Sequence, residues 1–407
     1  MGIFDKFQHI VAGRQALEGA SADPFNVVVE RIDSATEAVV NGRNVVLAGT
    51  NNYLGLTFHP ECIEAACQAV RREGTGTTGS RAANGTYAGH LQLERALAQF
   101  YGRPTAMVFS TGYLANLGVL SALGGADDVI LLDGDCHASI YDACRLSSAD
   151  VIRFRHNDVD DLERRLRRLG SRAANTLIVV EGIYSMLGDR APLADIVEVK
   201  DRYGAHLVVD EAHSLGVVGQ GGRGLSEEAG VEDRVDFIVG TFSKSLGATG
   251  GFCVSRHPQL DLLRYTSRPY IFTASPSPSV VASTLTALRV MKAHPELRIR
   301  LWDNARLLYG RLEKLGFALG PEPSPVVAVT LPTRDQALAL WTGLLDRGVY
   351  VNLVFPPATP NGAFLLRCSV SAAHSREQLE RICQAFAELR PAIGLGAGLR
   401  HAGDPAL

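Results

Sequence analysis

Short apolar runs alternate with helical stretches through the middle of the chain. Leu177–Val180 and Leu207–Val209 are apolar at consecutive positions rather than at every second one, which is typical of strands buried on both faces of a sheet. Comparable β-rich runs occupy Ala106–Ser110, Val129–Leu132, Val151–Phe154, Thr176–Glu181, His206–Asp210 and Asp236–Thr241. This alternation predicts an α/β protein with a mostly parallel central sheet that is covered by helices.

The N-terminal segment has a different pattern. Its first residues mix apolar and polar side chains at helical spacing, and two short apolar runs, Glu37–Val40 and Asn44–Leu47, then flank Asn41-Gly42. An Asn-Gly pair between apolar runs is a strong signal for a β-hairpin. We therefore expect an N-terminal helix and hairpin arm over residues 1–47.

The C-terminal third of the chain also departs from the central pattern. Past Pro295, an amphipathic helix is followed by an apolar run at Val326–Leu331, a helix over Asp335–Arg347 and short strands near Val349 and at Phe364–Ser369. These elements predict a smaller α+β domain. We therefore expect a large domain over residues 48–285, a small C-terminal domain over 286–395 and a tail over 396–407.

Composition and charge exclude several classes of protein. The net charge of −3 offers no electrostatic basis for wrapping nucleic acid. The seven cysteines include no Cys-x-x-Cys pair, which argues against a disulfide framework or a structural zinc site. Because no continuous apolar stretch resembles a signal peptide or a membrane span, we expect a cytoplasmic protein without a transmembrane segment.

A glycine-rich segment matches a nucleotide-binding fingerprint by its letters alone. Gly74–Gly79 reads G-x-G-x-x-G, but a dinucleotide site needs a preceding strand, and a P-loop needs a Lys-Ser/Thr pair that is missing here. The preceding segment, Glu61–Glu73, has helical spacing instead. We expect a turn after a helix, and a functional loop near a ligand stays open.

Asp210-Glu211-Ala212-His213 ends a predicted strand and spells a helicase Walker B box. A DEAH-type nucleic-acid-dependent ATPase is therefore an alternative from a different class. Such an enzyme needs a lysine on its β- and γ-phosphates, which the Gly74–Gly79 segment does not supply. A metal site built on Asp210 and His213 is a third interpretation, although its remaining ligands are not identifiable.

Asp210 gains a different meaning beside the next predicted strand. That strand runs into Thr241-Phe-Ser243-Lys244, and both segments end at the edge where open α/β sheets bind ligands. A lysine held among small residues can form a Schiff base, and pyridoxal 5′-phosphate (PLP) needs such a lysine and an acid on its ring nitrogen. Thr241 and Ser243 would donate to its phosphate. The combination predicts a PLP site.

These residues belong to longer segments that resemble the α-oxoamine synthases. This family comprises PLP enzymes of the aspartate-aminotransferase fold, PLP-dependent transferase fold type I, which condense an amino acid with an acyl-CoA and release CO2. The resemblance runs from Phe25 to about Ala387 and is carried by Asn52–Gly55, Gly76–Arg81, Phe109–Asn116, Asp135–Ser139, Glu181–Met186, Asp210–Ser214 and Thr241–Lys244.

Within that family, the chain is most similar to the soluble bacterial serine palmitoyltransferases. Arg153–Asn157, Arg268–Ser275 and Pro356–Pro360 carry this similarity. It implies a homodimeric acyltransferase of sphingolipid synthesis that makes 3-oxosphinganine from L-serine and palmitoyl-CoA. An 8-amino-7-oxononanoate synthase or a glycine-using relative is the nearest alternative. The acyl-chain length, an acyl-carrier-protein donor and transient membrane contact stay open.

The resemblance also implies roles for single residues. Lys244 would form the Schiff base and then act as the base at Cα, while Asp210 would keep the ring nitrogen protonated. His137 would stack on the ring, and His213 and Ser185 would bond its phenolic oxygen. The phosphate would meet Gly112, Tyr113, Thr241 and Ser243, with Thr273 and Ala274 reaching the phosphate of the partner.

The substrate carboxylate would bind Arg367, assisted by Asn52. Arginine suits this task because its planar fork binds a carboxylate through two hydrogen bonds. Two departures affect this site: close relatives carry a tyrosine where Asn51 stands and an arginine where Phe355 stands. We therefore expect Arg367 to provide most of the carboxylate recognition.

Overall fold

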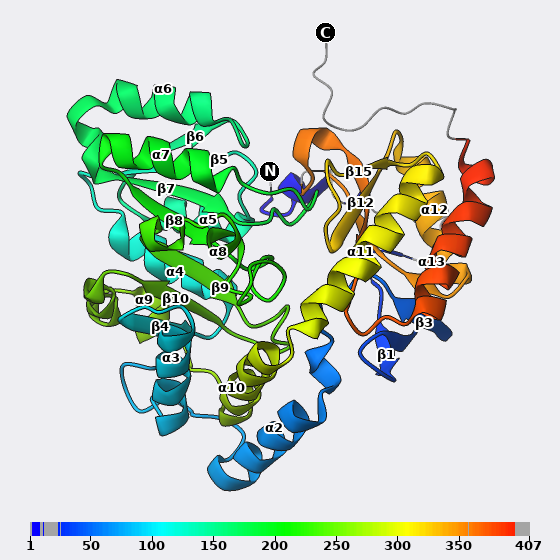
Figure 1. The fold of residues 1–407 in the computed structure, drawn as a ribbon, viewed down its shortest axis with the longest axis horizontal. Helices are drawn as coiled ribbons and strands as arrows, with labels where there is room; N and C mark the ends of the chain where they lie inside the picture. Colours follow the sequence, from blue (N-terminus) through cyan, green and yellow to red (C-terminus); the bar gives the residue numbers. More distant parts are fainter. Residues whose placement is uncertain (1, 9–10, 12–22, 25, 357, 395–407) are drawn as a thin grey trace.

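A seven-stranded sheet forms the centre of the larger part of the molecule (Figure 1). The computed structural model describes residues 2–8, 11, 23–24, 26–356 and 358–394. The strand order is β4-β10-β9-β8-β7-β5-β6, with β4 at Thr105–Phe109, β5 at Val129–Asp133, β6 at Asp150–Phe154, β7 at Thr176–Glu181, β8 at His206–Asp210, β9 at Phe237–Thr241 and β10 at Gly251–Ser255.

Most of this sheet is parallel, as the sequence predicts. The exception is β10, which pairs antiparallel with both β4 and β9. The sequence analysis does not predict β10, because its glycine-rich start is typical of a turn. Its direction places the start of β10 beside the end of β9, and this brings the two glycines at 250 and 251 next to the candidate site.

The central strands are buried on both faces. In β7, Ile178 and Val180 belong to one apolar cluster, whereas Leu177 and Val179 belong to another on the opposite face. Helices cover both faces: α6 (Val159–Leu169) and α7 (Leu193–Tyr203) contribute to the first cluster, and α4 (Gly112–Leu123) and α5 (Ala138–Leu146) contribute to the second. The consecutive apolar positions therefore predicted the layering of this domain correctly.

Further helices surround this sheet. They are α2 (Pro60–Glu73), α3 (Ala88–Phe100), α8 (Leu225–Glu228), α9 (Arg268–Ile271) and α10 (Pro278–Ala293). The helix α2 lies beside α10 at the lower end of Figure 1. It also precedes the Gly74–Gly79 segment, which confirms the helix predicted there.

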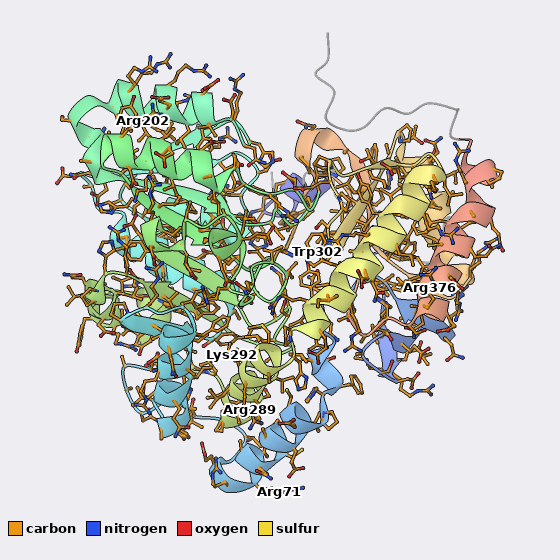
Figure 2. All side chains as sticks on the ribbon, viewed as in Figure 1. Arg71, Arg202, Arg289, Lys292, Trp302 and Arg376 are labelled. Carbon is orange, nitrogen blue, oxygen red and sulfur yellow. The ribbon has the colours of Figure 1, made fainter. Side chains whose placement is uncertain are left out.

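The long helix α11 (Glu296–Lys314) leads to the smaller part of the molecule. Its Trp302, labelled between the two parts in Figure 2, donates from Nε1 to the carbonyl of Val217 at 2.8 Å. A four-stranded antiparallel sheet follows, in the order β11-β12-β15-β14. It comprises β11 (Ala318–Leu319), β12 (Val326–Leu331), β14 (Asn352–Val354) and β15 (Phe364–Ser369), packed with α12 (Arg334–Asp346) and α13 (Arg376–Leu389).

The predicted N-terminal hairpin is present. Strands β2 (Glu37–Val40) and β3 (Arg43–Leu47) pair antiparallel, and Asn41 and Gly42 have φ values of 48° and 71°, as this type of tight turn requires. Strand β1 (Val29–Ile32) pairs with β2, and β3 pairs in parallel with β13 (Val349–Tyr350). The hairpin therefore shares one core with α12 and α13.

Parts of the predicted architecture lie outside the described residues. They are most of the N-terminal helix and the tail at 396–407. A short 3-10 turn covers Asp5–Phe7. Within the described ranges, no helix has the length and apolar character needed to cross a membrane.

Candidate active site

The carboxyl ends of β8 and β9 meet at one edge of the large sheet. β8 ends at Asp210, and Lys244 follows β9 by three residues. Because the two strands are parallel neighbours, both side chains reach the same cavity, which has a volume of about 270 Å³. Further predicted residues line it: Gly112, Tyr113, His137, His213, Thr241 and Ser243.

Asp210 is buried and bonded only by neutral donors. Its Oδ2 accepts from the Asn116 side chain at 2.7 Å, and its Oδ1 accepts from the backbone amide of Ala212 at 2.9 Å. The amino group of Lys244 is near enough that the charge of Asp210 raises the pKa of that lysine. A buried carboxylate whose hydrogen bonds come only from neutral donors favours a positively charged ligand group such as a protonated ring nitrogen.

Lys244 has the properties of a reactive amine. Burial lowers the pKa of its amino group, the nearby carboxylates of Asp210 and Glu181 raise it, and Arg367 lowers it again; the resulting value is about 8. A lysine with this pKa is partly neutral near physiological pH, and only the neutral amine can act as a nucleophile or a base.

The start of α4 offers free amides to an anion. The Thr111 hydroxyl caps the helix by accepting from the amide of Leu114 at 3.0 Å, so the amides of Gly112 and Tyr113 precede the first intrahelical hydrogen bond. A Cβ atom on Gly112 would lie 2.8 Å from Cβ of Thr241. Glycine therefore lets the helix start approach β9, where the hydroxyls of Thr241 and Ser243 lie 2.8 Å apart. This donor set fits a phosphate.

His137 also lines the cavity. Its Nδ1 is 2.8 Å from the hydroxyl of Ser139, which also accepts from Asn116 at 3.0 Å. The backbone amide of His137 donates to Glu181. Burial lowers the pKa of the His137 imidazole, so its ring is neutral and is held in position by hydrogen bonds at its edge.

Glu181 was not singled out by the sequence analysis as a site residue. It ends β7, is 3% exposed and lines the cavity. Burial raises the pKa of its carboxyl group well above the ordinary value, and the charge of Asp210 raises it further. The signal that would have identified it is its position at the end of a buried strand next to β8.

A chain of hydrogen bonds connects His213 with Arg367. The hydroxyl of Tyr53 lies 2.7 Å from His213 Nδ1 and 3.5 Å from Arg367 Nη2. Burial lowers the pKa of His213 well below its ordinary value, so this imidazole is neutral. Tyr53 is fully buried. The sequence analysis included it only within the segment Asn52–Gly55 and gave it no role.

Arg367 is held in a fixed orientation by the groups around it. Its Nε donates to the carbonyl of Ser185 at 2.6 Å, and its Nη1 donates to Asn51 Oδ1 and to the hydroxyl of Ser369, both at 3.0 Å. Asn52 has other partners: its amide donates to the Thr57 hydroxyl at 2.7 Å. Of these two neighbouring asparagines, Asn51 is the one that contacts Arg367.

Five predicted site residues lie outside the lining of this cavity: Asn52, Ser185, Thr273, Ala274 and Arg367. Ser185 lines a neighbouring cavity of about 690 Å³, to which His137 also contributes. Thr273 and Ala274 follow the exposed Phe272, and Ala274 forms an isolated bridge with Ser80. Phe355, at the second departure from relatives, stacks edge-on against Phe364 with 5.9 Å between ring centroids.

Comparison with known proteins agrees with this geometry. The sequence profile of the family "Aminotransferase class I and II" matches residues 43–386. The chain belongs to that family. A serine palmitoyltransferase of Caulobacter vibrioides is 57% identical over 402 residues, which are 99% of this chain and 100% of the relative. One of Sphingomonas paucimobilis is 50% identical over 396 residues, 97% of this chain and 94% of the relative.

A solved structure has the same fold. It is a serine palmitoyltransferase with a PLP internal aldimine; it is 49% identical, covers 97% of this chain and 100% of its own, and has a TM-score of 0.94. The similarity confirms the aminotransferase-like fold and the predicted resemblance to α-oxoamine synthases, among them the bacterial serine palmitoyltransferases.

The sequence analysis also raised a DEAH-type ATPase and a metal site as interpretations of Asp210-Glu211-Ala212-His213. Membership in the aminotransferase family argues against both. Glu211 is fully buried and accepts hydrogen bonds from Ser214 and from the amides of Leu225 and Ser226. It therefore serves the local fold rather than a nucleotide or a metal.

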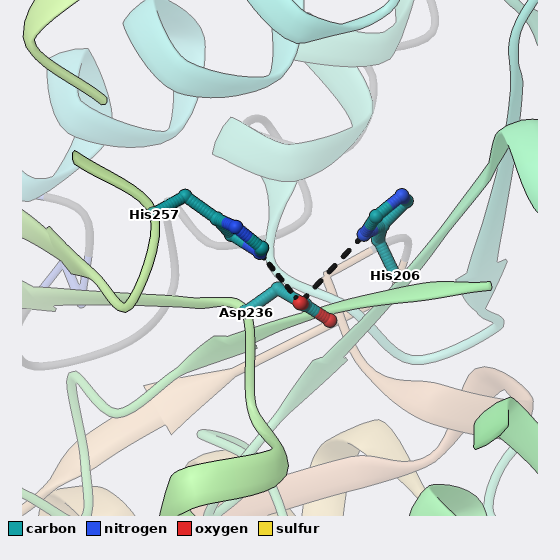
Figure 3. A group of neighbouring side chains, drawn as sticks. All are labelled: His206, Asp236 and His257. Atoms are coloured by element: carbon teal, nitrogen blue, oxygen red, sulfur yellow. Dashed lines mark hydrogen bonds and ion pairs between the residues drawn. The ribbon is translucent and has the colours of Figure 1, made fainter. Parts of the chain in front are cut away.

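A possible metal-binding group lies at the opposite edge of the sheet. Ligand atoms of His206, Asp236 and His257 lie within 4.8 Å of one another (Figure 3). However, Lys200 and Arg256 also approach the Asp236 carboxylate, each at 3.4 Å. These two cations already neutralise the carboxylate, so the arrangement favours an internal ion-pair cluster over a metal site.

Proposed function

We propose that this chain is a PLP-dependent serine palmitoyltransferase. It condenses L-serine with palmitoyl-CoA, releases CoA and CO2, and makes 3-oxosphinganine for sphingolipid synthesis. The observation that carries this proposal is the pair of Asp210 and Lys244 in one cavity: a buried carboxylate with neutral donors only, opposite a lysine whose pKa is about 8. Full-length similarity to serine palmitoyltransferases supplies the choice of substrates.

The cavity fits PLP at each of its polar groups. Asp210 suits the protonated ring nitrogen, and the amides of Gly112 and Tyr113 together with the hydroxyls of Thr241 and Ser243 suit the phosphate. When bound, PLP supplies an electron sink that makes the Cα–H bond of serine acidic. Lys244 holds the cofactor and takes the proton from serine Cα.

The two histidines act in their neutral forms. His137 presents a ring that is fixed at its Nδ1 by Ser139, which supports its predicted stacking on the cofactor. His213 is fixed at its Nδ1 by Tyr53, so its other ring nitrogen is free to bond the phenolic oxygen of the cofactor with Ser185.

Arg367 binds the carboxylate of serine and thereby sets the direction of the Cα substituents. Its 5% exposure and its bonds to Ser185, Asn51 and Ser369 pre-orient the guanidinium before substrate arrives, which lowers the entropic cost of binding. Asn51 accepts from Arg367 and helps to hold the guanidinium, and the contact of Asn52 with the substrate carboxylate stays a prediction.

The enzyme is a homodimer with shared active sites. Thr273 and Ala274 do not line the cavity of their own chain, which supports their predicted contact with the phosphate in a second copy. Cofactor binding and association are then linked. Removal of PLP should weaken the dimer in sedimentation experiments, and a monomer with full activity would contradict the shared site.

The cytoplasmic location stays a prediction and is supported by seven cysteines, all without a disulfide bond.

An absorbance titration followed by thioester assays tests the function. L-serine should change the spectrum of the PLP-loaded enzyme, and product should form only when palmitoyl-CoA is added. Amino-acid turnover without any acyl-CoA would indicate an aminotransferase. A response to alanine without one to serine would favour an 8-amino-7-oxononanoate synthase, and a response to glycine alone would favour a glycine-using relative.

A further inference from the structure

A charged histidine outside the cavity joins two segments of the large domain. His156 follows β6, and its Nδ1 lies 2.8 Å from Asp133, while its Nε2 lies 2.7 Å from Asp189. Burial lowers the pKa of His156, but hydrogen bonds and charge from these two carboxylates outweigh burial and raise the pKa to about 10. An imidazolium therefore bridges two carboxylates at neutral pH.

Asp189 belongs to a short loop that follows β7. This segment, residues 182–190, is closed by two backbone hydrogen bonds. The amide of Tyr184 donates to the carbonyl of Asp189 at 2.9 Å, and the amide of Gly188 donates to the carbonyl of Tyr184 at 3.0 Å. The ring of Tyr184 lies perpendicular to the His156 ring at 4.5 Å between centroids. His156 therefore contacts this loop at both Asp189 and Tyr184.

The tip of the same loop touches the small domain. The carbonyl of Ser185 accepts from Arg367 Nε at 2.6 Å. A Cβ atom on Gly188 would lie 2.5 Å from the carbonyl oxygen of Val326, so the loop and β12 are already in close contact. Because this packing leaves little slack, a shift of the loop would move the carbonyl that orients Arg367.

We propose that His156 is a positioning residue for the substrate carboxylate. By joining Asp133 to Asp189, it fixes the loop whose Ser185 carbonyl orients Arg367. This inference rests on the proposed function, in which Arg367 binds serine. His156 itself lines neither the cofactor cavity nor the neighbouring cavity that contains Ser185, so its effect passes through the loop.

Removal of the positive charge of His156 should weaken serine binding more than it slows the later steps of the reaction. In His156→Gln, one amide can serve only one carboxylate, and the two acids then repel each other. Misplacement of a positioning group by about 1 Å costs on the order of 100-fold. We expect the dissociation constant of serine to rise about 10- to 100-fold, with PLP content and KM for palmitoyl-CoA unchanged and kcat lowered less. His156→Arg restores a cation with two donor edges and should recover part of the loss.

The matched control is His257→Gln. It breaks a comparable contact, 2.8 Å from His257 Nε2 to Asp236, at the other edge of the sheet, and the two side chains have similar exposures of 33% and 26%. It should lower thermal stability without changing serine affinity. An equal rise in the serine dissociation constant in this control would show that general destabilisation explains the effect.

The test measures serine dissociation constants by absorbance titration, both KM values, PLP content and the melting temperature. A wild-type enzyme that does not respond to serine would overturn the proposed function. A normal wild type with unchanged serine affinity in His156→Gln would overturn this inference alone. Should that variant fail to fold, Asp189→Asn, which neutralises the other end of the contact, is expected to show the same selective loss, and unchanged serine affinity there would equally overturn the inference.

Discussion

Two buried aspartates on adjacent strands of one sheet have opposite surroundings. Asp210, at the carboxyl end of β8, is bonded by the neutral groups of Asn116 and Ala212. Asp236, just before β9, forms ion pairs with Lys200 and Arg256. It also faces His206 and His257 (Figure 3). Burial of a carboxylate is therefore a poor guide to function by itself; what distinguishes the active edge is that Asp210 is hydrogen-bonded only by neutral groups and shares its cavity with the reactive amine of Lys244.

The charges around Asp236 explain why this edge of the large sheet stabilises the fold rather than binding a ligand. Burial alone would raise the pKa of this carboxyl group, but hydrogen bonds from His206, His257 and the Leu207 amide lower it well below the usual range, with help from Lys200. Its charge is used to hold β8, β9 and the end of β10 together. The charge of Asp210 remains available for a ligand.

The largest expected effect contrasts Lys244 with the buried Lys200. Lys244→Ala removes the amine that holds PLP and moves the proton, and we expect kcat to fall about 10⁴-fold or more with loss of the characteristic cofactor absorbance. Lys200→Ala should keep activity and lower the melting temperature. Turnover by Lys244→Ala near the wild-type rate would refute its role, as would borohydride labelling of a different lysine.

The second contrast uses the aspartates themselves. Asp210→Asn should lower kcat on the order of 10²- to 10³-fold with a small change in stability, because the lost charge acts on the cofactor ring. Asp236→Asn should destabilise the fold, since it leaves Lys200 without its buried carboxylate, and should spare kcat of the folded fraction. Steady-state kinetics combined with thermal unfolding separates the two outcomes. If both variants lose mainly kcat, or both lose mainly stability, the contrast between the two aspartates is wrong.

A third prediction concerns the small-domain side of the active edge. Arg367→Ala loses a charge-assisted contact to the substrate carboxylate, worth about 2–4 kcal/mol, and should reduce kcat/KM for serine roughly 30- to 1,000-fold while PLP stays bound. Phe355→Ala should be far milder, because Phe355 packs against Phe364. Near wild-type kcat/KM in Arg367→Ala would remove Arg367 from the carboxylate site.

The smallest expected effect is a pH dependence of stability. The pKa of His156 is about 10 in the folded protein, against an ordinary value of 6.5. Its stabilisation is therefore complete below about pH 6.5 and is lost as the pH rises through about 10. The melting temperature of the wild type should fall more steeply over this interval than that of His156→Gln. Parallel curves for the two proteins would contradict the raised pKa.

Local signals were sufficient for much of the fold. Asn41-Gly42 predicted the hairpin because both residues tolerate a positive φ, and the consecutive apolar runs of β7 and β8 predicted burial on both faces. The pairing of Asp210 with Lys244 followed because neighbouring parallel strands end at the same edge. Strand β10 was missed, since the glycines at its start are needed for close approach to the helix start rather than for a turn alone.

The amino-acid sequence by itself determined which residue types are available for the chemistry: a lysine and an acid at two strand ends, hydroxyls for a phosphate and an arginine in an apolar strand. Only the tertiary structure decided which side chains meet. Tyr53 and His213 are 160 residues apart, and Asn51 and Arg367, which are also hydrogen-bonded, are 316 residues apart. Such contacts are set by packing between distant elements, which no local pattern encodes.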